Sequence, residues 1–377
     1  MAPKEILVGI IGVGLVGSEL VSQILSIPAA RNPFKIVFLS SSRKALYDTV
    51  TSPDAWKAAL DASSDPADLK AVAGYLQTLV AQGSGSTQRQ AVIVDNTSSD
   101  DVARLYPEWL KAGVSVVTPN KKAFSGDKAV WDAILAASAA PGAGRWLNES
   151  TVGAGLPVIN TLKEMLGSGD RVKKIEGVFS GTMSYIFNEW SAATPSVNPP
   201  KFSEVVRVAR EKGYTEPHPA DDLNGADVAR KLTILARTVS AFSIADGKGS
   251  LPELQSYEDV DTQGLIPTPL EGIKTGDEFV ERLPKYDGDF ERVRVQAEKE
   301  GQVLRFVGVV DVEEGVVKAG LAQYPVTHPF ATSLGGSDNI IMFHTERYSP
   351  RPLIVQGSGA GAAVTAMGVL GDLLKLA

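Results

Sequence analysis

A glycine triplet near the N-terminus constrains the fold of this chain more than any other feature. Gly12, Gly14 and Gly17 directly follow the apolar run ILVGII and directly precede the helix-like stretch SELVSQIL. Glycines in this context let the backbone turn tightly and approach a pyrophosphate, whose charge the helix N-terminal amides meet. A tight turn alone is the alternative, but the strand-to-helix context favours a dinucleotide site. The residues assigned to it are Gly12, Val13, Gly14, Leu15, Val16 and Gly17.

Short apolar runs alternate with amphipathic stretches through the first 147 residues. The runs KIVFLS, AVIVD and VSVVT are continuously apolar, which is typical of strands buried on both faces. Such strands separated by helices form a parallel sheet. We expect helices near residues 56–60 and 69–80 and a loop at 83–87. The sequence therefore predicts an α/β protein that begins with a Rossmann-type doubly wound nucleotide-binding domain.

The pattern changes after Trp146. Longer elements now mix with strands such as KIEGVFSG and VLRFVGVVDV, and Pro, Gly and Ser reach turn density at 194–200 and 244–253. We expect an α+β second domain with a mixed sheet.

Composition limits the classes of partner. The net charge is −7 without long runs of one sign, which argues against nucleic acid and anionic membrane. With no cysteine, the chain has no disulfide, zinc–thiolate site or thiol nucleophile. No signal-peptide pattern or apolar span of membrane length is visible. We expect a cytoplasmic protein that acts on small molecules.

Polar residues follow the predicted strands at their carboxyl ends, where ligands of open α/β sheets collect. Ser40 and Arg43 stand where an NAD-preferring site usually has an acid, and this pair suits the 2′-phosphate of NADP; an exposed basic turn is the alternative. Thr97 and Ser98 follow the next long strand, although turn chemistry alone also explains them. Lys121 follows VSVVTPN and is predicted to face cofactor and substrate.

The stretch TEPHPADDLNGADVARK, residues 215–231, places several acids in front of a lysine. If a helix starts near Gly225, Lys231 falls on the same arc as the apolar residues, and Arg230, Thr233 and Arg237 fall opposite. Lys231 is therefore predicted to be buried.

Asp227 lies four residues before Lys231, so its carboxylate can reach the ammonium. Burial disfavours the charged lysine and nearby carboxylates favour it, so the group can be tuned as an acid or base near neutrality. A structural buried ion pair is the alternative.

Several motifs together resemble one family. The chain is similar to homoserine dehydrogenases, in particular the short single-function fungal type, over essentially its whole length. The motifs are GVGLVG, DNTSS, TPNKKAF, ESTVGAGLP, IEGVFSGTMSYIFNE, GYTEPHPADDLNGADVARK and QGSGAGAAVTAMGVLGD. The resemblance implies the reversible NAD- or NADP-dependent interconversion of L-aspartate 4-semialdehyde and L-homoserine, on the route to threonine and methionine.

The resemblance also assigns roles to single residues. It makes Lys231 the general acid/base and Lys121 the second active-site lysine. The residues it implies for substrate binding are Glu216, Asp227, Asp222, Thr182 and Tyr214. Besides residues 12–17, Ser40, Arg43 and Thr97, the implied cofactor contacts are Ser98, Lys121, Gly213 and Gly361.

The glycine-rich turn at 149–157 is implied to bind a structural monovalent cation, Na⁺. The carbonyls assigned to the cation are those of Glu149, Val152, Ala154 and Leu156; from the residues alone this segment is a turn or an oxyanion-type loop. Domain limits are expected at 1–147 for the cofactor domain, at 148–335 for the substrate and catalytic domain, and at 336–377 for the rest. This last part contains a homodimerisation strand region and a C-terminal helix that returns to the cofactor domain. Close helix packing alone is the alternative explanation for the glycines at 357–361.

Two other classes of protein share some of these features. Aspartate-semialdehyde dehydrogenase uses a thiol nucleophile, which a chain without cysteine lacks. A non-enzymatic NADP-sensing regulator would not need a buried lysine among acids. We also expect no regulatory module or fused kinase after Ala377.

Overall fold

The computed structural model describes residues 4–83, 88–194, 196–244 and 251–377. It contains two compact units, Met1–Pro157 with Ala360–Ala377, and Val158–Gly359.

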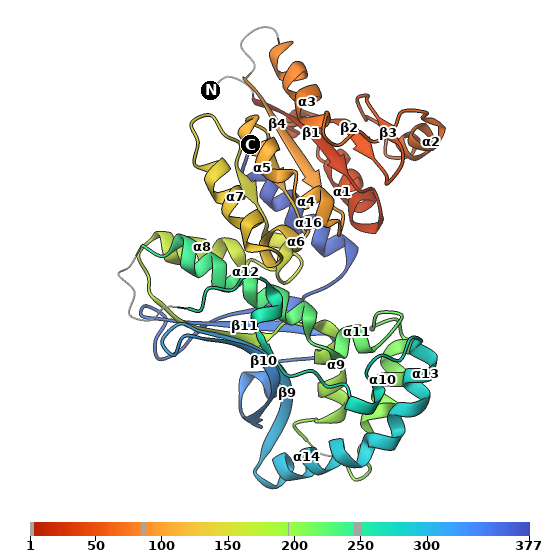
Figure 1. Ribbon diagram of the computed structural model, residues 1–377, viewed down its shortest axis with the longest axis vertical. Helices are drawn as coiled ribbons and strands as arrows, with labels where there is room; N and C mark the ends of the chain where they lie inside the picture. Colours follow the sequence, from red (N-terminus) through yellow and green to blue (C-terminus); the bar gives the residue numbers. More distant parts are fainter. Residues whose placement is uncertain (1–3, 84–87, 195, 245–250) are drawn as a thin grey trace. The chain divides into compact units, whose positions relative to one another are not determined.

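The first unit is a twisted α/β sheet with strand order β3-β2-β1-β4-β5-β6 (Figure 1). All neighbours pair in parallel except β3, which pairs antiparallel to β2. The strands are β1 (Lys4–Ile11), β2 (Phe34–Ser40), β3 (Ala45–Leu46), β4 (Gln88–Asp95), β5 (Ser115–Val117) and β6 (Trp146–Leu147). The order reverses between β1 and β4, and this is where a doubly wound sheet binds its ligand. The predicted fold of this domain is confirmed.

Helices surround this sheet. They are α1 (Leu15–Leu25), α2 (Ala55–Ala62), α3 (Val72–Ala81), α4 (Asp100–Ala103), α5 (Tyr106–Lys111), α6 (Lys122–Ser125), α7 (Lys128–Ser138) and α16 (Ala362–Leu374), with short 3₁₀ turns at Ala29–Arg31 and Glu149–Thr151. The helices expected near 56–60 and 69–80 correspond to α2 and α3. The C-terminal α16 is part of this unit because Ala366, Val369 and Leu373 join the core formed by β1 and α1. Burial of that apolar face stabilises the unit.

The second unit contains a mixed sheet with strand order β12-β11-β7-β9-β10-β8 (Figure 1). Only β8 and β10 pair in parallel. The strands are β7 (Val172–Val178), β8 (Asp261–Thr262), β9 (Gln302–Asp311), β10 (Val316–Pro325), β11 (Asp338–Thr345) and β12 (Leu353–Ser358). The predicted mixed sheet is confirmed.

The helices of the second unit include one long element against the sheet. They are α8 (Ile159–Gly167), α9 (Gly181–Trp190), α10 (Phe202–Glu211), α11 (Ala220–Leu223), α12 (Ala226–Phe242), α13 (Gly276–Arg282), α14 (Asp287–Lys299) and α15 (Pro329–Thr332), with 3₁₀ turns at Tyr257–Asp259, Thr268–Leu270 and Leu283–Tyr286. Helix α12 approaches the sheet closely at Gly308 of β9. A Cβ at that position would lie 2.8 Å from Leu232 and 2.9 Å from Phe179.

Helix α12 begins directly after Gly225, near the expected start, and the left-handed φ of 76° at this N-cap position suits glycine. The face opposite Lys231 is also buried, which the helical arc did not show. Thr233 is fully buried and Arg237 is 6% exposed, because residues 254–260 run alongside the helix. The guanidinium of Arg237 donates to the carbonyls of Leu254 and Gln255.

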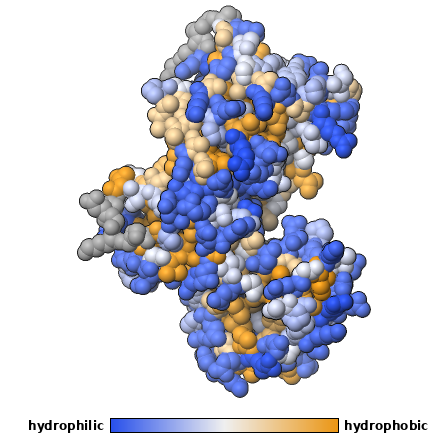
Figure 2. Space-filling view, in the orientation of Figure 1, coloured by the Kyte–Doolittle hydropathy of each residue, from blue (hydrophilic) through white to orange (hydrophobic). Residues whose placement is uncertain are grey.

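The remaining local predictions concern loops. Most of the loop expected at 83–87 and much of that at 244–253 lie outside the described residues, whereas 196–200 is irregular, as predicted. The visible face is mainly hydrophilic with scattered apolar groups (Figure 2). Within the described ranges no helix is long and apolar enough to cross a membrane.

Candidate active site

The glycine triplet forms the turn between β1 and α1. Gly12 has φ of +83°, and a Cβ at Gly17 would lie 2.1 Å from the carbonyl oxygen of Gly12. A Cβ at Gly14 would meet no described atom within 4 Å. Gly12 and Gly17 are thus required by the turn itself, whereas Gly14 leaves an open surface at the helix N-terminus, as a pyrophosphate site needs. The arrangement fits a dinucleotide.

This contrast gives a first prediction. Gly17→Ala places a methyl group against the turn, so we expect it to destabilise the fold by about 1–3 kcal/mol or more as well as weaken cofactor binding. Gly14→Ala should leave the melting temperature unchanged and weaken NADPH binding at least about tenfold. Calorimetric titration and thermal melts of both variants measure the two effects. Wild-type NADPH affinity in Gly14→Ala would contradict this assignment.

The end of β2 carries the residues assigned to the adenosine ribose. Ser40 is fully buried, and its Oγ has no hydrogen-bond partner among the described residues. Arg43 is exposed in the tight connection between β2 and β3, where its backbone N–H donates to Ser41 Oγ at 3.4 Å. Arg43 can therefore bind an anion at the protein surface, whereas Ser40 lies in the interior.

A buried network joins the loops after β4 and β5. The Asp95 carboxylate accepts hydrogen bonds from Tyr106 Oη at 2.5 Å, Asn120 Nδ2 at 2.9 Å and Thr97 N at 2.8 Å. The Asn120 amide also donates to the carbonyl of Ser99 at 2.9 Å. Burial raises the pKa of Asp95, and these hydrogen bonds oppose that rise. The two loops are therefore held together as one surface.

That surface carries three predicted site residues. Thr97 is part of the network, Ser98 is exposed beside it, and Lys121 is half-buried at the N-terminus of α6. The backbone before and after Lys121 is fixed, because Asn120 N donates to Thr118 Oγ1 and Lys122 N donates to Asn120 Oδ1. Asp95 and Asn120 stand within the strand-end motifs DNTSS and TPNKKAF, whereas no sequence pattern predicted that Tyr106 and Thr118 join them.

In the second unit, Lys231 is buried on α12, as predicted. Its side chain is 8% exposed, and Nζ lies 2.8 Å from Oδ2 of Asp227, whose side chain is 49% exposed. Nζ also donates to the carbonyl oxygen of Phe179 at 2.6 Å. An ammonium that is removed from water needs such partners. The pair is therefore neither a surface salt bridge nor an isolated buried charge.

The acidic stretch before α12 forms a second cluster. Oδ1 of Asp222 accepts from Thr182 Oγ1 at 2.9 Å, and Oδ2 accepts from Glu216 N at 2.8 Å. Thr182 Oγ1 also lies 2.6 Å from the carbonyl oxygen of Tyr214. Burial raises the pKa of Asp222, as do the charges of Glu216 and Asp227, and the two hydrogen bonds oppose this. The structure thus brings the predicted substrate residues together.

Comparison with known proteins identifies the family of both units. A family model described as "Homoserine dehydrogenase" matches residues 157–374, and one described as "Homoserine dehydrogenase, NAD binding domain" matches residues 12–146. The homoserine dehydrogenase of Saccharomyces cerevisiae is 45% identical over 382 residues, which cover 100% of this chain and 99% of that one.

The chain belongs to the homoserine dehydrogenase family. It is an NAD(P)-dependent oxidoreductase that acts on a CH–OH group, in the biosynthesis of threonine and methionine.

Solved structures agree with this family fold. A Candida auris protein of unknown function superposes with a TM-score of 0.88 at 43% identity, covering 99% of this chain and 98% of that one. A hyperthermophilic archaeal homoserine dehydrogenase solved with NADPH has a TM-score of 0.65 at 20% identity, covering 99% and 97%, and shares the fold.

The loop assigned to a cation by this family's motif lies in the first unit. Gly153 and Ala154 both have positive φ, 78° and 56°, so the backbone changes direction sharply at these two residues. The loop is fixed by α16, because Asp372 accepts from Glu149 N at 2.7 Å. At Gly368 of that helix a Cβ would lie 2.9 Å from the carbonyl oxygen of Ala154. Val152 is fully buried, and Leu156 partly. Among the described residues, no group of three His or acidic side chains is arranged to hold a metal ion.

The two remaining cofactor positions of the homoserine dehydrogenase motif pattern are glycines at helix ends. Gly213 follows α10 with φ of +70°, and Gly361 precedes α16 with φ of +117°. Neither conformation suits a side chain.

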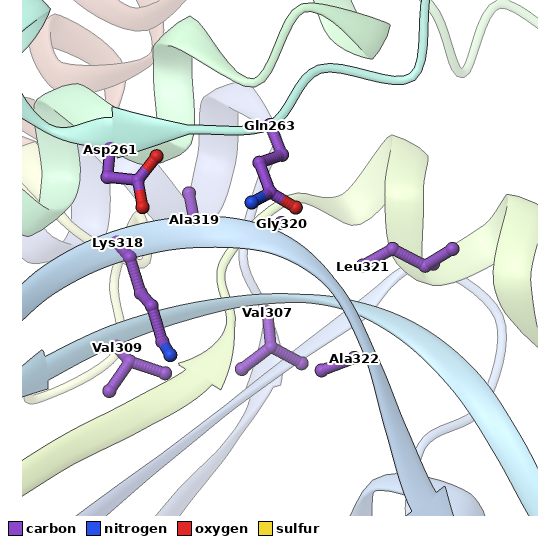
Figure 3. A pocket seen from close by; sticks show the side chains of 9 residues that line it. All are labelled: Asp261, Gln263, Val307, Val309, Lys318, Ala319, Gly320, Leu321 and Ala322. Atoms are coloured by element: carbon purple, nitrogen blue, oxygen red, sulfur yellow. The ribbon is translucent and has the colours of Figure 1, made fainter.

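A cavity of about 140 Å³ lies on the other face of the second sheet, over β8, β9 and β10. Figure 3 shows Lys318 running toward Val309 along this face. Val307 and Val309 face away from α12, because the intervening Gly308 contacts Leu232. The cavity is therefore separate from Lys231.

Proposed function

We propose that Lys231 is the general acid/base in the reversible, NAD(P)H-dependent reduction of L-aspartate 4-semialdehyde to L-homoserine. The observation that supports it is the buried ammonium held between Asp227 and the carbonyl of Phe179. In the reductive direction the nicotinamide, when bound, supplies hydride to the aldehyde carbon. The Lys231 ammonium donates a proton to the oxygen, so that the aldehyde becomes a primary alcohol and the lysine becomes a neutral amine. In the oxidative direction the neutral amine removes the hydroxyl proton.

The substrate is a zwitterion, so its site needs acids for the ammonium group and donors for the carboxylate. We assign Glu216 and Asp227 to the ammonium, since both carboxylates are exposed beside the half-buried Asp222. Thr182 and Tyr214 complete this part of the site. Asp222 acts by holding Thr182 and the backbone of Glu216, because its two oxygens accept hydrogen bonds from them.

Lys121 is proposed as the second active-site lysine. Its support is its position after β5, on the surface that Asp95 organises and at the sheet edge where ligands of doubly wound folds collect. A lysine there can polarise the reacting oxygen or orient the cofactor.

The direct test of the proposed function is turnover. Wild-type protein should oxidise NADPH on addition of L-aspartate 4-semialdehyde, and the product should be L-homoserine by mass spectrometry. A protein that binds NADPH but shows no aldehyde-dependent oxidation would refute the proposed function.

We propose that the protein prefers NADP because Arg43 binds the 2′-phosphate, next to Ser40 at the end of β2. Replacing Arg43 by glutamate puts a like charge against a 2′-phosphate, and charge-assisted contacts contribute about 1.5–3 kcal/mol. We expect the NADPH/NADH ratio of kcat/KM to fall roughly tenfold or more while NADH kinetics change little. Lys57→Glu on α2, which is also exposed, serves as the control for net charge. An unchanged ratio in Arg43→Glu would exclude the role.

We also propose a structural monovalent cation, Na⁺, bound by the carbonyls of Glu149, Val152, Ala154 and Leu156. Two observations support this proposal. Gly153 and Ala154 both have positive φ, and Asp372 fixes the loop by accepting a hydrogen bond from Glu149 N. Carbonyl oxygens are suitable ligands for a hard cation.

A cytoplasmic homodimer is the proposed state of the protein. The sheet face opposite α12 carries Val309, Ala322 and Tyr324 only partly buried around a small apolar cluster. A partly buried apolar face of this kind suits a second copy of the chain.

A further inference from the structure

The carbonyl oxygen of Phe179 accepts two buried hydrogen bonds. One comes from Lys231 Nζ at 2.6 Å, and the other comes from Asn339 Nδ2 at 3.0 Å. Phe179 and Asn339 are both fully buried. They lie just beyond the pair Val178 and Ile340, where β7 and β11 run antiparallel. The oxygen that holds the lysine is therefore itself held from the neighbouring strand.

The orientation of the Asn339 amide follows from this contact, because only its nitrogen can donate to a carbonyl. Its Oδ1 is then buried and accepts no hydrogen bond from the described residues. An unpaired buried oxygen is unfavourable, and a leucine of similar size would avoid it. Packing alone therefore does not explain an asparagine at position 339. The hydrogen bond that its Nδ2 donates to the Phe179 carbonyl does.

Gly359 lies directly against the amide of Asn339. A Cβ at this position would lie 2.0 Å from Nδ2 and 2.1 Å from Cγ of Asn339. The strands β11 and β12 pair here, with Asn339 opposite Gly357. Only glycine at 359 leaves room for the amide to reach Phe179.

The geometry points to Asn339 as a positioning residue for the general acid/base: it fixes the Phe179 carbonyl oxygen and, through it, the Lys231 ammonium. This inference rests on the proposed role of Lys231. The other anchor, Asp227, is half exposed and cannot fix the ammonium as a buried carbonyl can. The peptide after Phe179 also begins α9 at Ser180, whose Oγ caps the helix at Met183 N. Rotation of this peptide would move the proton donor and the helix start that carries Thr182.

The first test is Asn339→Leu, which keeps the volume and removes the donor. We expect kcat to fall about 10- to 100-fold, since a small misplacement of a reacting group has effects of this size. KM for homoserine and the Kd for NADPH should stay within about threefold of wild type. Thr345→Val is the matched control, because Thr345 is buried on the same strand and donates to Asp170 at 2.8 Å. It should lose stability but not kcat.

Gly359→Ala is the second variant, because it displaces the amide without removing it. It should lower kcat in the same way, and it tests the inference even where Asn339→Leu folds poorly. Wild-type kcat in folded Gly359→Ala or in folded Asn339→Leu would overturn the inference.

A Lys231→Met background separates the inference from the proposed function. There, Asn339→Leu should cause no further loss of kcat, because the group it positions is gone. A further tenfold loss would show that Asn339 acts elsewhere. If Lys231→Met alone kept wild-type turnover, the proposed function would fail; if Lys231→Met lost turnover and Asn339→Leu did not, only the role of Asn339 would fail.

Discussion

Lys231→Met is expected to lower kcat in both directions by about 10²–10⁴-fold, the range that a positioned general acid or base contributes. Methionine has a similar length and suits the buried position, so the fold should remain intact. NADPH affinity should be unchanged, because the contacts of the lysine lie in the second unit, with Asp227 and Phe179. Stopped-flow measurement of NADPH oxidation and of homoserine-dependent reduction of NADP⁺ gives both rates.

Lys231→Arg separates proton transfer from charge. Arginine restores a cation but does not release its proton in the working pH range, so the oxidative rate should stay as low as in Lys231→Met. Lys299→Met, at an exposed position on α14, is the control for loss of a lysine and should have wild-type turnover. Wild-type rates in Lys231→Arg would mean that the lysine only contributes charge.

Lys231 also shows what sequence periodicity can and cannot predict. Its burial followed from the apolar residues that share its helical arc, because one face of α12 packs against β9. The opposite face was not predictable by the same argument. It is buried because residues 254–260, distant in sequence, run along it and accept the hydrogen bonds of Arg237. Helical periodicity predicts the face of a helix that packs on the core. Burial of a second face depends on tertiary contacts that the periodicity does not contain.

In the first unit, the loops after β4 and β5 also depend on contacts that the sequence pattern does not predict. Polar residues after β4 and β5 were predicted to face a ligand because parallel strands end at one edge. What sequence could not show is that Asp95 is a buried acceptor for Tyr106 and Asn120, since these contacts join separate loops. Asn339 is a stronger case. It lies in an ordinary strand start, and only the β7–β11 pairing places its amide at the carbonyl that Lys231 uses.

Asp222→Asn is expected to lower kcat/KM for homoserine by about 10- to 100-fold, because hydrogen bonds to charged groups contribute about 1.5–3 kcal/mol. The carboxylate accepts from Thr182 Oγ1 and from Glu216 N. An asparagine offers one acceptor oxygen and no charge, so the bond from Glu216 N loses its charge assistance and the Thr182 hydroxyl has to accept from the amide instead of donating to a carboxylate. Steady-state kinetics with varied homoserine measure the effect. Asp221→Asn, one residue earlier and exposed, is the matched control and should keep wild-type kcat/KM.

The pH dependence of the same residue gives an independent check. Burial raises the pKa of Asp222, and the charges of Glu216 and Asp227 raise it further. Only the ionised carboxylate accepts both hydrogen bonds, so kcat/KM should fall as the pH drops toward this raised pKa, above the usual aspartate range.

The contribution of Asp222 to folding stability changes with pH in the opposite direction to its effect on kcat/KM. A folded pKa above the unfolded one makes the contribution of Asp222 to stability greatest at low pH, and this contribution is lost as the pH rises through the folded pKa. Acid inactivation at Asp222 should therefore occur while the protein remains folded by circular dichroism, and this acid limb should be absent in Asp222→Asn. If the limb persists in that variant, another group is responsible for it, and Asp222 does not set the geometry of Glu216 and Thr182.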